Sequence, residues 1–175
     1  MATGMIRPAK AEDIQGLAAL KSTYFKNLFQ CFLPPETLEK ATPESFVQNF
    51  TECLHGAGTY LDLMTLDNVC VAYIVYGVQR DDPSSGWIAD AGMDLLQSAS
   101  VRETTYHHTL SVLQNAGCTQ VRQWVLRENF RLRFHMEKLG FKDNGTRRSI
   151  MMDGTSLNMA QYVYRLGGEN DSVQD

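Results

Sequence analysis

GWIADAGMDLLQSASVRETTYHHTLSVLQN, residues 86–115, is the stretch that decides the fold. Its first part predicts a strand over about residues 87–96, in which Gly92 is interpreted as a β-bulge. A short crossing loop follows, and then apolar residues recur at the spacing of one helix face. The residues expected to face the core from this helix are Tyr106, Leu110 and Leu113.

The segments before this stretch predict an edge strand, two helices and a hairpin. Residues 5–7 form a short start, apolar at Met5 and Ile6, that Pro8 interrupts, which is typical of an edge strand. Pro34 and Pro35 break the chain after the first helix, and Thr42 is expected to cap the second. Strands over 59–66 and 69–78 are joined by a two-residue turn. The positions expected to be buried are Ile14, Leu17, Leu20, Phe25 and Leu28 in the first helix and Phe46, Val47, Phe50 and Leu54 in the second.

The segments after it predict a strand, a helix and a second hairpin. The strand covers 119–126, and Asn129 is a good cap for the helix, which Gly140 ends in a left-handed conformation. The hairpin joins strands near 147–152 and 157–166 through a turn at 153–154. We expect one domain over residues 1–166, followed by a disordered acidic tail at 167–175. The inward positions of the helix are Leu132, Met136 and Leu139.

Composition excludes several classes of function. The chain has 175 residues, of which 43% are apolar, and this suits one compact domain. A formal charge of -4 argues against nucleic acid and anionic membranes as partners. Four dispersed cysteines without a CxxC pair indicate reduced thiols and no metal site. Without a signal peptide or a long apolar run, we expect a cytoplasmic protein.

ENF at residues 128–130 and EKLGF at 137–141, together with this order of elements, resemble the GNAT superfamily of acyl-CoA-dependent N-acetyltransferases. The resemblance extends over most of the chain, including IRPAKAEDIQGL at 6–17. It implies an α/β (α+β) fold with a central mixed, mostly antiparallel sheet of about seven strands and four helices. It also implies that strands 4 and 5, here 87–96 and 119–126, splay apart to admit the pantetheine arm of acetyl-CoA.

The phosphate-binding loop departs from the family pattern. Members usually have a glycine-rich loop of the form Q/R-x-x-G-x-G/A, whereas the aligned residues 98–107 here read SASVRETTYH, without glycine. Ser100 and Glu103 have the spacing of a capping box, which would occupy the backbone amides of the helix N-terminus. Glu103 would also repel a pyrophosphate, whereas Arg102 would pair with one. The resemblance places the cofactor against Leu95, Leu96, Arg102, Thr104, Thr105 and Asn129.

The catalytic positions are also altered. Members often have a tyrosine before the EKLGF-like segment that protonates the leaving thiolate; the matching residue here is Met136, which cannot donate a proton. The neighbouring His135 is a candidate acid, and its alternative is a surface or partner-facing side chain. Asp90 is the candidate general base, with an ordinary polar strand residue as the alternative. His107 and His108 are expected on the exposed face of their helix.

Three hypotheses of function follow. The first is a degenerate GNAT protein with weak or absent acetyl-CoA-dependent activity, which binds a ligand or protein in the old cleft or forms a homodimer through its sheet edges. The second is an active enzyme that transfers an acetyl group from acetyl-CoA to a primary amine of a small molecule or protein. The third is transfer from an acyl carrier protein, which the acidic surface disfavours. Aromatic residues that are expected either in an acceptor cleft or in the core are Tyr24, Phe25, Phe29 and Phe32.

Overall fold

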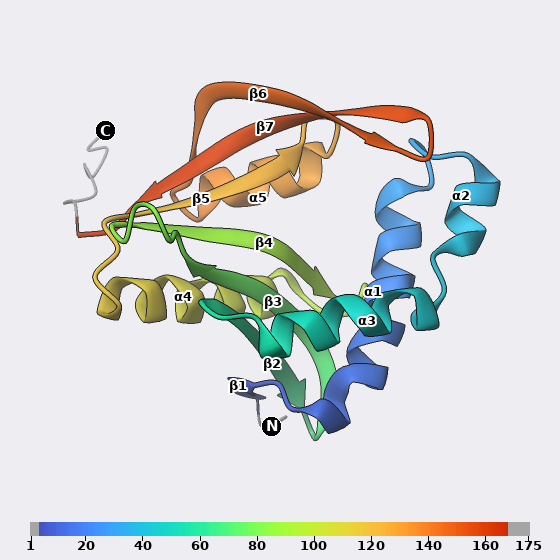
Figure 1. Ribbon diagram of the computed structural model, residues 1–175, viewed down its shortest axis with the longest axis horizontal. Coiled ribbons are helices and arrows are strands. Elements are labelled where there is room, and N and C mark those ends of the chain that lie inside the picture. Colours follow the sequence, from blue (N-terminus) through green and yellow to red (C-terminus); the bar gives the residue numbers. More distant parts are fainter. Residues whose placement is uncertain (1–3, 168–175) are drawn as a thin grey trace.

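A computed structural model describes residues 4–167 as one seven-stranded sheet with helices on both faces (Figure 1). The strand order is β1-β2-β3-β4-β5-β7-β6. The pair β4–β5 is parallel and the other neighbours are antiparallel, which confirms the predicted mixed, mostly antiparallel sheet. The strands are β1 Gly4–Pro8, β2 Thr59–Leu66, β3 Val69–Val78, β4 Ser85–Met93, β5 Gln120–Leu126, β6 Lys142–Met152 and β7 Thr155–Arg165.

Two pairs of helices enclose the sheet. Buried residues of α1 and α3 pack on one face of β2 and β3, while α4 and α5 pack on the other face around β4 and β5. Residues 4–167 contain five α-helices where four were expected, because Pro35 begins a short helix instead of only breaking the chain. Proline suits a first helical position, where its missing N–H costs nothing. The helices are α1 Ile14–Phe29, α2 Pro35–Lys40, α3 Pro43–His55, α4 Ala99–Asn115 and α5 Phe130–Lys138.

Both predicted hairpin turns are confirmed. Asp67 and Asn68 have positive φ angles of 48° and 65°, and Asp153 and Gly154 have 49° and 83°. Positive φ at both central residues gives the turn a twist that matches its flanking strands. The second hairpin begins earlier than predicted, since β6 starts at Lys142. The central strand β3 is buried on both faces, as its continuous apolar run indicated.

The parallel strands β4 and β5 separate along their length, as predicted. They pair only over Ser85–Ile88 and Gln120–Gln123. Beyond these residues β4 runs on to Met93 beside β3, while β5 runs on to Leu126 beside β7. In Figure 1 the two strands diverge toward the side where α1 lies. The sheet therefore opens into a V between β4 and β5. Along the two arms of this V, the backbones of β4 and β5 form no hydrogen bonds with each other.

The bulge in β4 lies at Ala89, so the prediction of a bulge at Gly92 is wrong. Val75 of β3 faces Asp90 and its neighbour Tyr76 faces Ile88, which leaves Ala89 without a partner. Gly92 stays in register. It is needed for space, because a Cβ at this position would lie 2.5 Å from a ring carbon of Tyr73.

The predicted inward faces of α1, α4 and α5 are confirmed where they meet the sheet. Tyr106, Leu110 and Leu113 are at most 4% exposed, and Asn129 Oδ1 accepts the N–H of Leu132 at the start of α5.

None of the helices described is long and apolar enough to cross a membrane. The four cysteines are free thiols. Residues 168–175, which hold most of the predicted acidic tail, lie outside the described part of the chain.

Candidate ligand-binding cleft

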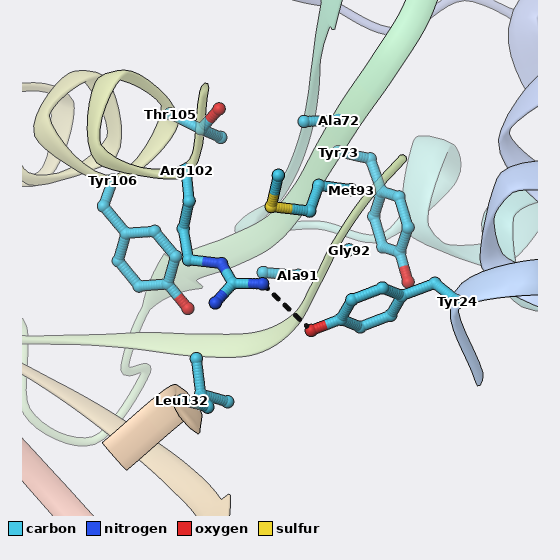
Figure 2. Close-up of a pocket in the computed structure, with 10 residues that line it drawn as sticks. All are labelled: Tyr24, Ala72, Tyr73, Ala91, Gly92, Met93, Arg102, Thr105, Tyr106 and Leu132. Atoms are coloured by element: carbon cyan, nitrogen blue, oxygen red, sulfur yellow. Dashed lines mark hydrogen bonds between the residues drawn. The ribbon is translucent and has the colours of Figure 1, made fainter. Parts of the chain in front are cut away.

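A narrow cleft lies beside the end of β4, and helices from both faces of the sheet help to line it. Its free interior measures about 10 Å³, roughly the space of one water molecule. Figure 2 shows aromatic rings and one guanidinium group converging on it. The lining residues are Tyr24 of α1, Ala72 and Tyr73 of β3, Ala91, Gly92 and Met93 of β4, Arg102, Thr105 and Tyr106 of α4, and Leu132 of α5.

Arg102 places a cation inside this cleft. It lies one helical turn before Tyr106, so its side chain extends from the buried face of α4. Its Nη2 donates a long hydrogen bond of 3.5 Å to the hydroxyl of Tyr24, which comes from the other side of the sheet (Figure 2). Within residues 4–167 the guanidinium forms no ion pair. Its charge is therefore half-buried without an acidic partner.

Three tyrosines surround the guanidinium, and each hydroxyl is held differently. Tyr73 donates to Asp90 Oδ2 at 3.1 Å, and Tyr106 donates to Gln123 Oε1 at 2.9 Å. The hydroxyl of Tyr24 accepts from Arg102 and donates to no group in the described part of the chain. Burial raises the pKa of all three phenols, so each keeps its proton at neutral pH.

Asp90 lies beside the cleft, on the face of the sheet that α1 and α3 cover. Its Oδ2 accepts from Lys21 Nζ at 2.6 Å as well as from Tyr73. The ammonium of Lys21 also lies over the rings of Phe46 and Phe50, 5.1 Å and 5.4 Å from their centroids. Asp90 and Lys21 border a recess of about 370 Å³. Asp90, the candidate base, is thus ion-paired with Lys21. Neither interpretation from the sequence, a general base or an ordinary polar strand residue, included this ion pair.

His135 is buried, so its interpretation as a surface residue is wrong. Its side chain points inward with 8% of the residue exposed, and its Nε2 has no hydrogen-bond partner among the described residues. Burial lowers the pKa of the imidazole, and the positive charge of Arg102 lowers it further, while Glu103 opposes this. Met136, at the position of the family's acid, is fully buried in the core. This position offers no proton donor.

The predicted capping box of α4 does not form. The helix begins two residues earlier than expected, with Ser98 as its N-cap, so that Ser100 is already inside the first turn. No side chain caps the helix, and the Ser98 hydroxyl pairs instead with that of Ser100 at 2.6 Å. The backbone amides of this turn are therefore not occupied by Ser100 and Glu103. Glu103 is half-buried and acts electrostatically on His135.

The other residues expected at the cofactor divide into two groups. Thr105 lies in the cleft wall, where its hydroxyl donates to the carbonyl of Val101 at 2.8 Å. Asn129 acts on the cleft indirectly, because it caps the turn of α5 that carries Leu132. Three others are exposed and do not line the cleft: Leu95, Leu96 and Thr104.

Two residues of the site were not recognised from the sequence. Lys21 falls between Leu17 and Tyr24 on the buried stripe of α1, and this inward spacing was the available signal. Tyr73 is hidden in the apolar run of β3. Of the aromatic residues with two interpretations, Tyr24 lines the cleft, whereas Phe25, Phe29 and Phe32 pack against a core cluster.

His107 is exposed as predicted, but His108 forms a contact that the sequence did not indicate. Its Nε2 lies 3.0 Å from Oδ2 of Asp62, a buried carboxylate that also accepts from the hydroxyl of Tyr76 at 2.6 Å. This cluster lies outside the residues that line the cleft. Between residues 4 and 167, no three acidic, histidine or cysteine side chains group as a metal site would require.

No protein-family model and no curated protein sequence matches the chain. Solved structures match it over almost its whole length. PaiA N-acetyltransferase from Thermoplasma acidophilum, solved in complex with coenzyme A, has 15% sequence identity and a TM-score of 0.73, with 94% of this chain and 99% of that chain covered. The chain has the GNAT fold.

Two further solved structures illustrate the range of this likeness. A probable acetyltransferase from Staphylococcus epidermidis has 10% identity and a TM-score of 0.76, with 93% of this chain and 99% of that one covered. Ribosomal-protein-S5-alanine acetyltransferase from Vibrio fischeri has 13% identity and a TM-score of 0.71, and both chains are covered completely. At such identities the GNAT likeness establishes the fold and leaves the activity open.

Proposed function

We propose that this GNAT-fold chain is a binding protein with weak or absent acetyl-CoA-dependent activity. The observation that carries the proposal is the position of Arg102, whose guanidinium lies in the cleft beside the end of β4. With that side chain in place, the cleft beside β4 has room for about one water, so a pantetheine arm could enter it only if Arg102 moved away.

Two further features support the proposal. The residues from Met93 to Ala116 include no glycine, so every residue of the turn into α4 carries a Cβ atom. A phosphate approaches the backbone amides of such a turn more closely where the residues are glycines, which have no Cβ. The position of the family's acid is the buried Met136, and the nearby His135 has a pKa below its ordinary value. The chemistry would therefore lack both a close cofactor anchor and a proton donor at that position.

The alternative is an active N-acetyltransferase that acts on a primary amine of a small molecule or protein. The uncapped N-terminus of α4 favours it, because unpaired N–H groups and the helix dipole attract phosphate. So does Asp90, which is adjacent to the bulge at Ala89 and would serve as the base. The similar structure from Thermoplasma acidophilum is in complex with coenzyme A, and this also favours the active enzyme.

A titration of acetyl-CoA separates the two functions. We expect the melting temperature of the purified protein to stay constant up to millimolar acetyl-CoA. Tight binding would add about 2.7 kcal/mol at a hundredfold excess over the dissociation constant, which is a rise of roughly 5–10 °C for a chain of this size. Such a rise, together with thiol release in the presence of a primary amine, would establish the enzyme and end the present proposal.

A further inference from the structure

The guanidinium of Arg102 is a half-buried cation that forms no ion pair with any residue from 4 to 167. It has five N–H donors in a planar fork, and the described residues use one of them, in the long bond to Tyr24. A second arginine in the same part of the fold, Arg133, shows the contrast: its Nε donates to Tyr162 at 3.0 Å and its Nη1 to the carbonyl of Arg127 at 3.0 Å. Arg102 therefore has N–H donors left for a further hydrogen-bond acceptor.

A second donor converges on the same point. Because the Tyr24 hydroxyl accepts from Arg102 and gives its own proton to no described residue, it is available to donate to a bound group. Tyr73 and Tyr106 do not compete, since their hydroxyl protons are already given to Asp90 and Gln123. The described lining of the cleft thus presents two kinds of donor and no acidic side chain, and the nearby carboxylate of Asp90 accepts from Tyr73.

The nearby imidazole of His135 agrees with a site arranged around negative charge. It is more than nine-tenths buried, its Nε2 has no partner, and it is close enough to Arg102 for that cation to lower its pKa. An anion beside Arg102 would offset the effect of this cation. The imidazole is one turn beyond Leu132, which forms the wall of the cleft.

The rest of the lining is apolar. Ala72, Ala91, Gly92, Met93 and Leu132 offer methyl, methylene and thioether groups and no side-chain donor. A fully hydrated inorganic anion would gain nothing from these contacts, whereas an organic anion would bury its carbon chain against them. The planar fork of arginine also matches the two oxygens of a carboxylate.

We propose that the cleft binds an organic carboxylate. One carboxylate oxygen fills the small free interior of the cleft and accepts from Arg102, and Tyr24 donates to the same group. The hydrocarbon part lies at the mouth of the cleft beside Ala91, Gly92 and Met93, because the free interior has room for the carboxylate oxygen alone. This inference rests on the proposed function, because it assigns to a carboxylate the gap that an acyl-CoA enzyme would give to its thioester.

The test compares butyrate with butyramide, which has a similar shape and no charge, by ligand-observed NMR at constant ionic strength. We expect butyrate to bind at least tenfold more tightly than butyramide. The variant Arg102→Gln is expected to lose this preference, and Tyr24→Phe to weaken butyrate binding severalfold. The matched control is Arg165→Gln, which removes the same charge from the exposed end of β7 and should bind butyrate as the parent does.

Each other outcome overturns the inference. Equal binding of butyrate and butyramide, or unchanged butyrate affinity in Arg102→Gln, would show that the guanidinium holds no carboxylate. Inorganic phosphate that competes with butyrate at equal concentration would reduce the site to a general anion site. In a parallel experiment, acetyl-CoA is titrated into the same protein preparation and the melting temperature is followed. A rise in melting temperature contradicts the proposed function. If neither acetyl-CoA nor butyrate binds, only the inference of a carboxylate site is contradicted.

Discussion

The ammonium of Lys21 lies 2.6 Å from Oδ2 of Asp90, and together they connect helix α1 to the strand that carries the bulge. The two side chains are 18% and 32% exposed, so water screens the pair only in part. Removing either partner leaves a charge in a recess bordered by the ring of Phe50.

We therefore expect Lys21→Met and Asp90→Asn each to lower the free energy of unfolding by about 1–2 kcal/mol, which is less than for a fully buried pair. Because each single change breaks the same interaction, the double variant should lose less than the sum of the two, by about 1 kcal/mol. Urea unfolding of the four proteins measures this coupling. Lys26→Met, at an exposed position of the same helix, is the control, and additive single effects would mean that the contact contributes nothing.

The elements that the sequence predicted well are those decided by neighbouring residues. The turns at Asp67 and Asp153 follow from short polar residues that tolerate positive φ, and the inward face of α4 follows from a spacing of three to four residues. In the structure, the same spacing brings Arg102 and Lys21 to the buried faces of their helices. The hydrophobic pattern did not predict this, because it assigns charged residues to the surface by default.

The contacts that build the candidate site were beyond prediction because their partners are distant in the chain. Lys21 and Asp90 are separated by 69 residues, and Arg102 and Tyr24 by 78. Whether an inward charge is paired, and with what, depends on how the helices are placed on the sheet. The capping box failed for a local reason: two serines, Ser98 and Ser100, compete for the start of α4, and the helix begins at the first.

His135 gives the protein a dependence of stability on pH. Burial and the charge of Arg102 lower the pKa of the folded imidazole below its unfolded value near 6.5. In mildly acidic solution the unfolded chain binds a proton that the folded chain does not, so stability falls as the pH drops through about 6.5. We expect His135→Gln to show a smaller loss between pH 7 and pH 5.5 in urea unfolding. Parallel curves for the two proteins would exclude this role.

Arg102 contributes to the same pH dependence, because its charge is the second cause of the lowered pKa of His135. In Arg102→Gln the folded imidazole should titrate closer to its ordinary range, and its NMR resonances follow this directly. A shift in the opposite direction would contradict the electrostatic account.

The buried carboxylate of Asp62 in β2 is held by Tyr76 of β3 and His108 of α4. Tyr76→Phe removes one donor and leaves the carboxylate with a single partner, so we expect a loss of about 1–3 kcal/mol in the free energy of unfolding. The control is Tyr60→Phe, because Tyr60 stacks on Tyr76 but is 45% exposed. Equal, small effects of both changes would show that the hydroxyl of Tyr76 does not stabilise Asp62.

The last prediction concerns the two roles that Arg102 would have toward acetyl-CoA. If its side chain obstructs the gap between β4 and β5, then Arg102→Ala removes the obstruction. Acetyl-CoA should then raise the melting temperature of the variant while leaving that of the parent unchanged. If the arginine instead pairs with a phosphate, the parent responds and the variant responds less, by roughly tenfold in affinity for one charge-assisted contact. A flat response in both proteins would mean that the side chains of the turn into α4 exclude the cofactor without help from Arg102.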